Sequence, residues 1–233
     1  MLHSVAKEDH LCNKRFYLQQ RNKDMLIYSI TKTSEDVFKL NTSLGSFFLR
    51  TSYLEENINF QQESLFDFEN LKPNTQVSFE ISENIIEASL LFSVERTAVA
   101  YLERAEHSTE MLRRKLKTKG YSPNAIEKVL TFAKKRNWLS DERYAGAFLR
   151  NRSIRKAEGR TRLLAELASR GINRETAEKA LDDFFQQKNE TDILARAASK
   201  LKKQRKTKEK AFQALIRLGF SWNDIKSYIN DNW

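Results

Sequence analysis

The segment Gly120–Leu130 reads GYSPNAIEKVL, and two close variants follow it, GINRETAEKAL at Gly171–Leu181 and GFSWNDIKSYI at Gly219–Ile229. The three segments begin 51 and then 48 residues apart. Each starts with a glycine, an apolar residue and a side chain that can cap a helix, followed by apolar residues at helical spacing. This pattern predicts a helix that ends at a left-handed glycine and a second helix that begins shortly after it.

The repeated unit extends on both sides of the glycine. A leucine precedes each glycine by four residues, at Leu116, Leu167 and Leu215. In the first two copies an aspartate, Asp141 or Asp192, follows Ser140 or Thr191 and opens a third helical run. The third copy stops after its second helix. Because each unit leaves apolar surface for its neighbours, such arrays tend to be elongated. We therefore predict a mainly α fold of elongated tandem three-helix repeats with a truncated third copy.

A different pattern precedes the repeats. Residues 15–49 contain short β-branched and aromatic runs separated by polar clusters, which is typical of strands. Residues 37–49 favour a hairpin with Gly45 in its turn. A short helix is expected at Ser52, and residues 75–82 alternate as a further strand before the helical period begins near Ser82. These patterns predict a small β-rich N-terminal segment.

The predicted organisation has five parts. It comprises a β-rich domain at 1–80, a helical connection at 81–107, three-helix repeats at 108–156 and 157–206, and a degenerate third repeat at 207–233.

The charge is divided unevenly between the two halves. The chain of 233 residues has a formal net charge of +10. Residues 1–95 carry 9 Lys and Arg against 14 Asp and Glu, whereas residues 96–233 carry 32 against 17. This asymmetry indicates a basic helical module that binds an anionic partner.

Several classes of protein do not fit the sequence. The N-terminus has no apolar signal region, and the most apolar stretch, from Ile85, is interrupted by Glu87. The single Cys12 suits a reducing compartment, so we expect a cytoplasmic protein with no membrane span. The glycines are too far apart for a phosphate-binding loop, and the three histidines are too scattered for a zinc site. We expect no catalysis, no metal and no cofactor.

Two clusters of basic residues are the strongest functional signal. The first lies along the third helix of the first repeat and enters the second repeat, with Arg143, Arg150, Arg152, Arg155, Lys156, Arg160 and Arg162. The second contains Lys200, Lys202, Lys203, Arg205, Lys206, Lys208 and Lys210. Arginine binds phosphate or carboxylate through two parallel hydrogen bonds. A solvated helix face remains the alternative for the lysine-rich cluster, whereas a mere scaffold would leave the arginines unexplained.

The segments DERYAGAFLRNR, from Asp141, and GRTRLLAELASRGI, from Gly159, closely resemble the regulatory protein RecX family. The resemblance covers about residues 98–230. It departs from the family pattern at the first helix start, where Met111 and Glu110 leave the capping box at Ser108 imperfect. The resemblance implies a curved protein of three-helix modules that lies in the groove of the RecA filament. It further implies a role in homologous recombination, DNA repair and the SOS response, usually as an inhibitor of ATP hydrolysis and strand exchange by RecA.

The resemblance suggests the partners, and the family motif together with the two basic clusters suggests the contact residues. The family motif includes Gly159 and Gly171, which we interpret as structural. We expect a monomer whose partner is the RecA filament, with single- or double-stranded DNA as a further partner. The expected partner-binding residues are Arg143, Arg150, Arg152, Arg155, Arg160, Arg162, Arg170, Lys202, Lys203 and Arg205.

A basic helical-repeat protein that binds DNA directly is the alternative. A cap, a short turn and a second helix also suit a helix-turn-helix geometry. However, the second helices offer few Asn, Gln or Arg side chains that could read base edges.

Overall fold

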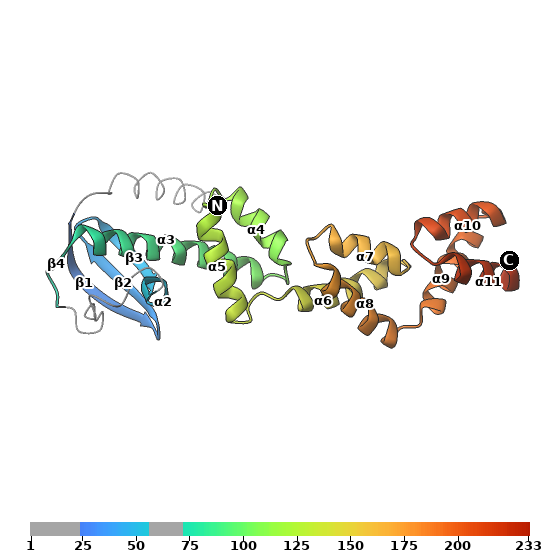
Figure 1. Ribbon diagram of the computed structural model, residues 1–233, viewed down its shortest axis with the longest axis horizontal. Helices are drawn as coiled ribbons and strands as arrows, with labels where there is room; N and C mark the ends of the chain where they lie inside the picture. Colours follow the sequence, from blue (N-terminus) through green and yellow to red (C-terminus); the bar gives the residue numbers. More distant parts are fainter. Residues whose placement is uncertain (1–23, 56–71) are drawn as a thin grey trace. The chain divides into compact units, whose positions relative to one another are not determined.

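The computed structural model describes residues 24–55 and 72–233. They form one four-stranded sheet and ten helices, which confirms the predicted mainly α fold with a small β-rich N-terminal part (Figure 1). The chain divides into two compact units. The first contains the described residues up to Ala100 together with Lys115–Phe132, and the second contains Tyr101–Arg114 and Ala133–Trp233. His3, His10 and Cys12 lie outside the described residues, as does part of the predicted domain 1–80.

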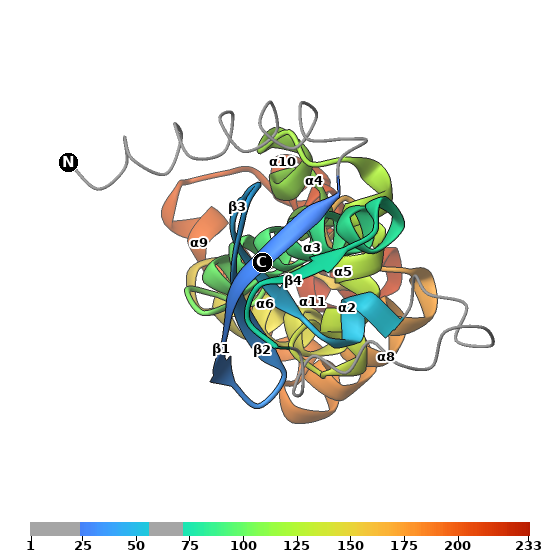
Figure 2. The same cartoon turned by 90° about the vertical axis from the view of Figure 1, so that its left-hand side faces the viewer.

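The sheet is antiparallel and has the strand order β3-β2-β1-β4. Its strands are β1 (Met25–Ser34), β2 (Val37–Thr42), β3 (Gly45–Arg50) and β4 (Thr75–Val77). The predicted hairpin is confirmed: β2 and β3 pair from Val37 to Arg50, and Gly45 begins β3 with a φ of 126°. Side chains such as Met25, Leu40 and Phe47 are buried, and Figure 2 shows α3 behind the sheet.

The boundary after β4 differs from the sequence prediction. The strand ends at Val77, and helix α3 (Phe79–Leu102) begins three residues before Ser82. Ser78 starts this helix, since its carbonyl accepts a hydrogen bond from the Ser82 N–H at 2.9 Å. Alternation over so few residues does not separate a strand from a helix start. The short helix expected at Ser52 is confirmed as α2 (Ser52–Glu55).

A nearly buried ion pair joins the sheet to α3. Arg50 donates from Nε to Glu95 Oε2 at 2.9 Å and also pairs with Asp36, while its guanidinium lies 5.7 Å from the Phe92 ring. Glu95 is only 3% exposed. Burial alone would lower the pKa of Arg50, but its hydrogen bonds to Glu95 and Asp36 raise it above the ordinary value. The first unit is therefore stabilised by packing and by a charged contact that needs both partners.

The remaining helices confirm the predicted glycine stops. The helices are α4 (Thr109–Thr118), α5 (Pro123–Lys135), α6 (Asp141–Arg155), α7 (Arg160–Ala168), α8 (Arg174–Gln187), α9 (Glu190–Lys203), α10 (Lys208–Arg217) and α11 (Trp222–Asn232). Gly120, Gly171 and Gly219 have φ values of 85°, 77° and 87°. The predicted caps Ser122, Asn173 and Ser221 each accept a backbone N–H of the helix that follows.

The two aspartate-led helices begin differently. Helix α6 begins at Asp141, as predicted, and Ser140 caps it by accepting the Arg143 N–H at 3.2 Å. Helix α9 begins at Glu190 and not at the predicted Asp192. The amide oxygen of Asn189 accepts the Thr191 N–H at 3.0 Å, so Asn189 is the cap of this helix.

The helices of the second unit pack across the predicted repeats. Helix α6 packs on α8, which also packs on α7, while α9 packs on α10 and α11. Leu167, Leu181 and Leu215 are fully buried in one hydrophobic cluster. The third helix of each predicted repeat therefore covers helices of the next repeat. The predicted limits of the repeats stay a prediction.

Two of the glycines also lie where neighbouring repeats approach. Ser108, the cap of α4, donates a 2.6 Å hydrogen bond to the Arg170 carbonyl, just before Gly171. A Cβ on Gly171 would lie under 3.0 Å from Cβ and Cγ of Glu110. In the next repeat, Gly159 N–H donates to the Leu218 carbonyl at 2.9 Å, just before Gly219. In both places the start of one repeat contacts the glycine that ends the first helix of the next repeat. We call this contact a joint, and the structure contains it twice among the described residues.

In the second joint, backbone atoms of the two repeats approach each other closely. A Cβ on Gly219 would lie under 3.0 Å from the backbone nitrogen of Arg162, and a Cβ on Gly159 would lie equally close to the Gly219 carbonyl. A Cβ on Gly120, by contrast, would meet no atom of the described residues within 4 Å. Gly120 is thus required for its backbone conformation alone.

Candidate interaction surface

Arg143, the first of the expected contact residues, is held by the protein itself. From α6 its guanidinium donates to Glu106 at 2.9 Å and to the carbonyls of Asn137 and Trp138 at 3.0 and 2.9 Å. Asn137 has a left-handed φ of 56°. Arg143 therefore stabilises the loop between α5 and α6.

A network of arginines and glutamates connects α6 to α7. Arg152 donates to both carboxylate oxygens of Glu158, at 2.6 and 3.1 Å, and its Nη2 lies 3.1 Å from Glu166 Oε1. Arg170 donates to Glu166 at 2.8 Å, and its guanidinium lies 4.4 Å from the centre of the Phe148 ring. Burial would raise the pKa of Glu166, but hydrogen bonding to Arg170 and the charges around it lower it. The hydrogen bonds to Glu158 raise the pKa of Arg152.

Two further arginines of α7 are paired in the same way. Arg160 donates to Asp182 at 2.5 Å, and Arg162 donates to Glu166 at 3.1 Å. In α9, the ammonium of Lys202 donates to the Asn232 carbonyl and lies 5.3 Å from the Trp233 ring centre. Six of the ten expected contact residues therefore have internal partners.

The other four expected contact residues are exposed. Arg150 and Arg155 lie on α6, Lys203 ends α9, and Arg205 follows it with a left-handed φ of 54°. Within residues 24–55 and 72–233, no hydrogen bond or ion pair is made by the charged groups of these four side chains. Lys156, next to Arg155, is also exposed, and its ammonium is free by the same measure. Of the ten expected contact residues, these four therefore remain available to a partner.

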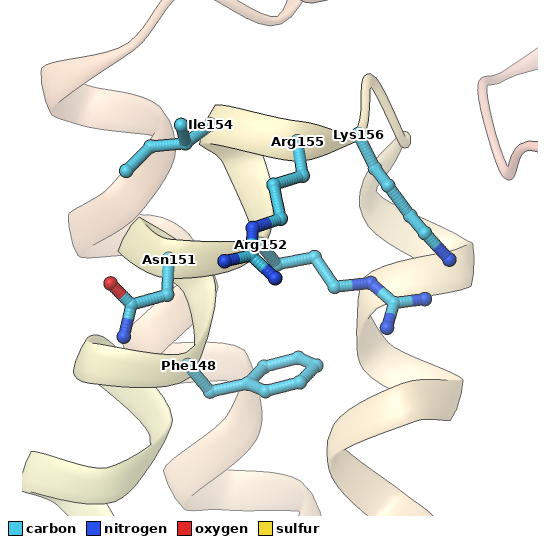
Figure 3. A pocket seen from close by; sticks show the side chains of 6 residues that line it. All are labelled: Phe148, Asn151, Arg152, Ile154, Arg155 and Lys156. Carbon is cyan, nitrogen blue, oxygen red and sulfur yellow. The ribbon is translucent and has the colours of Figure 1, made fainter.

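An open hollow of about 620 Å³ surrounds the end of α6. Phe148, Asn151, Arg152, Ile154, Arg155 and Lys156 line it. Figure 3 shows Ile154 and Lys156 at opposite ends, with Phe148, Arg152 and Arg155 between them. Ile154 is 75% exposed, whereas Tyr144, Ala145 and Leu149 of the same helix are buried. The hollow thus combines two apolar side chains, Phe148 and Ile154, with two free cations, Arg155 and Lys156.

A second groove, of about 430 Å³, lies between α6 and α8. Gly146 and Ala147 leave it open because their side chains are small, and Arg150, Lys179 and Asp183 line it. The structure thus brings Arg143 and Arg150 together in this groove and Arg152 and Arg155 together in the hollow. It does not bring Lys203 or Arg205 to either of them.

Two domain models of one protein family match the sequence of this chain. A model of the RecX second three-helix domain matches residues 140–181, and a model of the RecX first three-helix domain matches residues 96–132. A protein of Treponema pallidum named regulatory protein RecX is 36% identical over 130 residues, which are 56% of this chain and 79% of the relative. One from Neisseria meningitidis with the same name is 32% identical over 142 residues, or 60% of this chain and 92% of the relative.

The chain belongs to the RecX family. The fold agrees with two solved structures. A crystal structure of regulatory protein RecX has a TM-score of 0.70 at 18% identity and covers 89% of this chain and all of the other. RecX from Lactobacillus salivarius has a TM-score of 0.55 at 21% identity and covers 62% of this chain and 97% of the other.

Residues 24–55 and 72–233 contain no group of three or more His, Cys, Asp and Glu side chains placed to hold a metal ion. In the same part of this RecX-family chain, no helix is long and apolar enough to cross a membrane.

Two residues that shape this surface, Ile154 and Arg196, are not among the contact residues predicted from the sequence. Ile154 interrupts the arginine cluster as a lone apolar residue, and that position was the available signal. Arg196 of α9 donates to the carbonyls of Ser153 and Lys156 at 2.6 and 3.0 Å and so stabilises the end of α6. No spacing rule links Arg196 to residues forty positions earlier.

Proposed function

We propose that this chain regulates recombination by binding the RecA filament in its groove and inhibiting ATP hydrolysis and strand exchange. It acts as a cytoplasmic monomer and catalyses no reaction. The carrying observation is a set of free cations around the second half of α6: Arg155 and Lys156 line the hollow with the exposed Ile154, and Arg150 lines the neighbouring groove. Membership of the RecX family supports the regulatory role.

The character of the hollow supports a protein partner more than bare DNA. An exposed ion pair contributes about 0.2–1 kcal/mol. Burying an aliphatic side chain such as Ile154 contributes roughly 1.5–3 kcal/mol. A protein groove supplies both an apolar neighbour and carboxylates, whereas a phosphate backbone supplies only charge. The exposed Ile154 in the hollow therefore favours a protein partner.

Direct DNA binding remains a second candidate, because the charged groups of Lys203 and Arg205 also have no partner among the described residues and lie in a basic segment. Seven of the eleven residues from Lys200 to Lys210 are basic and only Glu209 is acidic. Such a segment suits a phosphate backbone.

The first test is charge reversal on α6. In the double variant Arg150→Glu with Arg155→Glu, inhibition of RecA ATP hydrolysis on single-stranded DNA should weaken about tenfold or more, because facing like charges cost several kcal/mol. Helix content should stay unchanged, since neither guanidinium has an internal partner among the described residues. The matched control, Lys117→Glu with Lys119→Glu, changes the net charge equally on the exposed end of α4. Full inhibition by the α6 variant would contradict the proposal.

A further inference from the structure

The last two helices expose an apolar surface next to the core. Trp222 is 53% exposed and Ile216 is 37% exposed. Phe212, half-buried, lies four residues before Ile216 on one face of α10, and its ring meets Trp222 edge-on with centroids 6.1 Å apart. We call Phe212, Ile216 and Trp222 the terminal patch. The core of these helices is made instead by Leu215, Ile225 and Ile229, which are almost fully buried.

The preceding repeats show what the fold requires at these positions. Aligned on the repeated glycines, the three places hold Leu164, Ala168 and Arg174 in the second copy. Arg174 is highly exposed and pairs with Glu178 at 2.7 Å. In the third copy this exposed ion pair is replaced by Trp222 and Lys226, whose ammonium lies 4.8 Å from the indole ring centre.

Phe212 packs against the core, as Leu164 does one repeat earlier, but folding alone does not explain the large apolar side chains of Ile216 and Trp222. Tryptophan is enriched among the residues that dominate protein–protein binding energy, and it acts there in apolar pockets of the partner. An exposed tryptophan beside an exposed isoleucine has the composition of the centre of an interface.

We propose that the terminal patch docks into an apolar pocket on an acidic protein surface, on the same RecA filament that the proposed function names. This inference rests on the proposed function and adds a second contact to it. Charge complementarity sets the partner: Lys208 lies one turn before Phe212 on α10, Lys226 lies over Trp222, and the basic segment 200–210 leads into the patch. An acidic rim around the pocket would neutralise these lysines.

The geometry fits a nucleic-acid strand less well. Bases stack on open aromatic faces, but Lys226 already lies over the indole of Trp222. Ile216 offers no aromatic surface on which a base could stack. A second copy of the chain fits poorly too, because joining two terminal patches would bring two basic segments together.

Two variants test the terminal patch. One is Trp222→Ala. The other is Trp222→Arg with Lys226→Glu, which copies the Arg174–Glu178 pair of the preceding repeat and so retains a side-chain pair that the fold already uses. The matched control is Arg174→Ala, at the equivalent exposed position one repeat earlier. Circular dichroism and thermal melting establish that each variant is folded.

Binding is measured by anisotropy of the labelled chain against a RecA filament formed with a non-hydrolysable nucleotide, and against the bare oligonucleotide. Both patch variants should lose about tenfold or more in filament affinity, as expected for a central tryptophan. They should change bare-strand affinity less than about twofold, and Arg174→Ala should change neither.

Three results would overturn the inference. Unchanged filament affinity would remove the terminal patch from the interface. An equal loss on the bare oligonucleotide would make it a base-stacking site, and self-association that Trp222→Ala abolishes in sedimentation would make it a dimer contact. If the patch variants bind normally while Arg150→Glu with Arg155→Glu does not, only the terminal patch fails. If the unaltered chain does not bind the filament, the proposed function fails as well.

Discussion

Replacing Gly219 by alanine should cost more free energy of unfolding than the same change at Gly120 or at Gly159. Gly219 and Gly159 lie in the second unit, and Gly120 lies in the first. Gly219 has a φ of 87°, and a side chain in the left-handed region costs about 1–2 kcal/mol. A Cβ there would also press on the Arg162 backbone, and overpacking costs about 1–3 kcal/mol. The two costs together give a loss of about 2–5 kcal/mol.

Two matched variants separate these costs. Gly120→Ala imposes only the conformational cost, about 1–2 kcal/mol, because its Cβ would meet nothing among the described residues. Gly159→Ala imposes only the close approach, about 1–3 kcal/mol, since its φ is −81°.

Urea unfolding measures the differences. Trp138, Trp222 and Trp233 all lie in the second unit, so tryptophan fluorescence reports on Gly159→Ala and Gly219→Ala. Far-ultraviolet circular dichroism reports on Gly120→Ala in the first unit. A loss below about 0.5 kcal/mol for Gly159→Ala, as at an ordinary surface site, would refute the close joint between the repeats.

Three further predictions concern stability. Arg50→Met should cost about 3–5 kcal/mol in the first unit, because it leaves Glu95 buried without its partner; chemical denaturation with a loss under 1 kcal/mol would speak against this. Leu167→Ala should cost about 2–5 kcal/mol, since Leu167 is fully buried, and a near-neutral melt would contradict that. The pKa of Glu166 is lowered below 4.5 on folding, so its contribution is complete above its unfolded pKa and is lost as the pH falls. The stability difference between the unaltered chain and Glu166→Gln should therefore shrink in acid, and a difference that is constant from about pH 7 to pH 3 would argue against this.

The helical repeat could be predicted from the sequence because its determinants are local. Gly120, Gly171 and Gly219 end helices through backbone conformation, and Ser122 and Ser221 cap the next helices through bonds that span three residues. The period of a repeat does not determine which helices pack together, however. That α6 packs on α8 depends on side chains brought together only in the folded chain.

The contact residues could be predicted only in part, for a related reason. Charge spacing identifies arginines, but it does not identify the carboxylates that fold against them. Glu106 pairs with Arg143, which lies 37 residues later in the sequence. Glu158 and Glu166 form ion pairs with Arg152. The cations left without such partners are the ones that can bind another molecule.

The most direct test of filament binding is a pair of titrations at about 50 and 200 mM salt. One uses bare single-stranded DNA, and the other uses RecA filament formed with a non-hydrolysable nucleotide. Binding dominated by phosphate contacts loses about 10³-fold or more over this range, whereas a groove that buries Ile154 and pairs Arg155 with carboxylates should lose much less. We predict tighter and less salt-dependent binding to the filament, with the loss in Arg150→Glu, Arg155→Glu confined largely to the filament. Equal affinities, equal salt slopes and equal losses in that variant would contradict filament binding and favour direct binding to DNA.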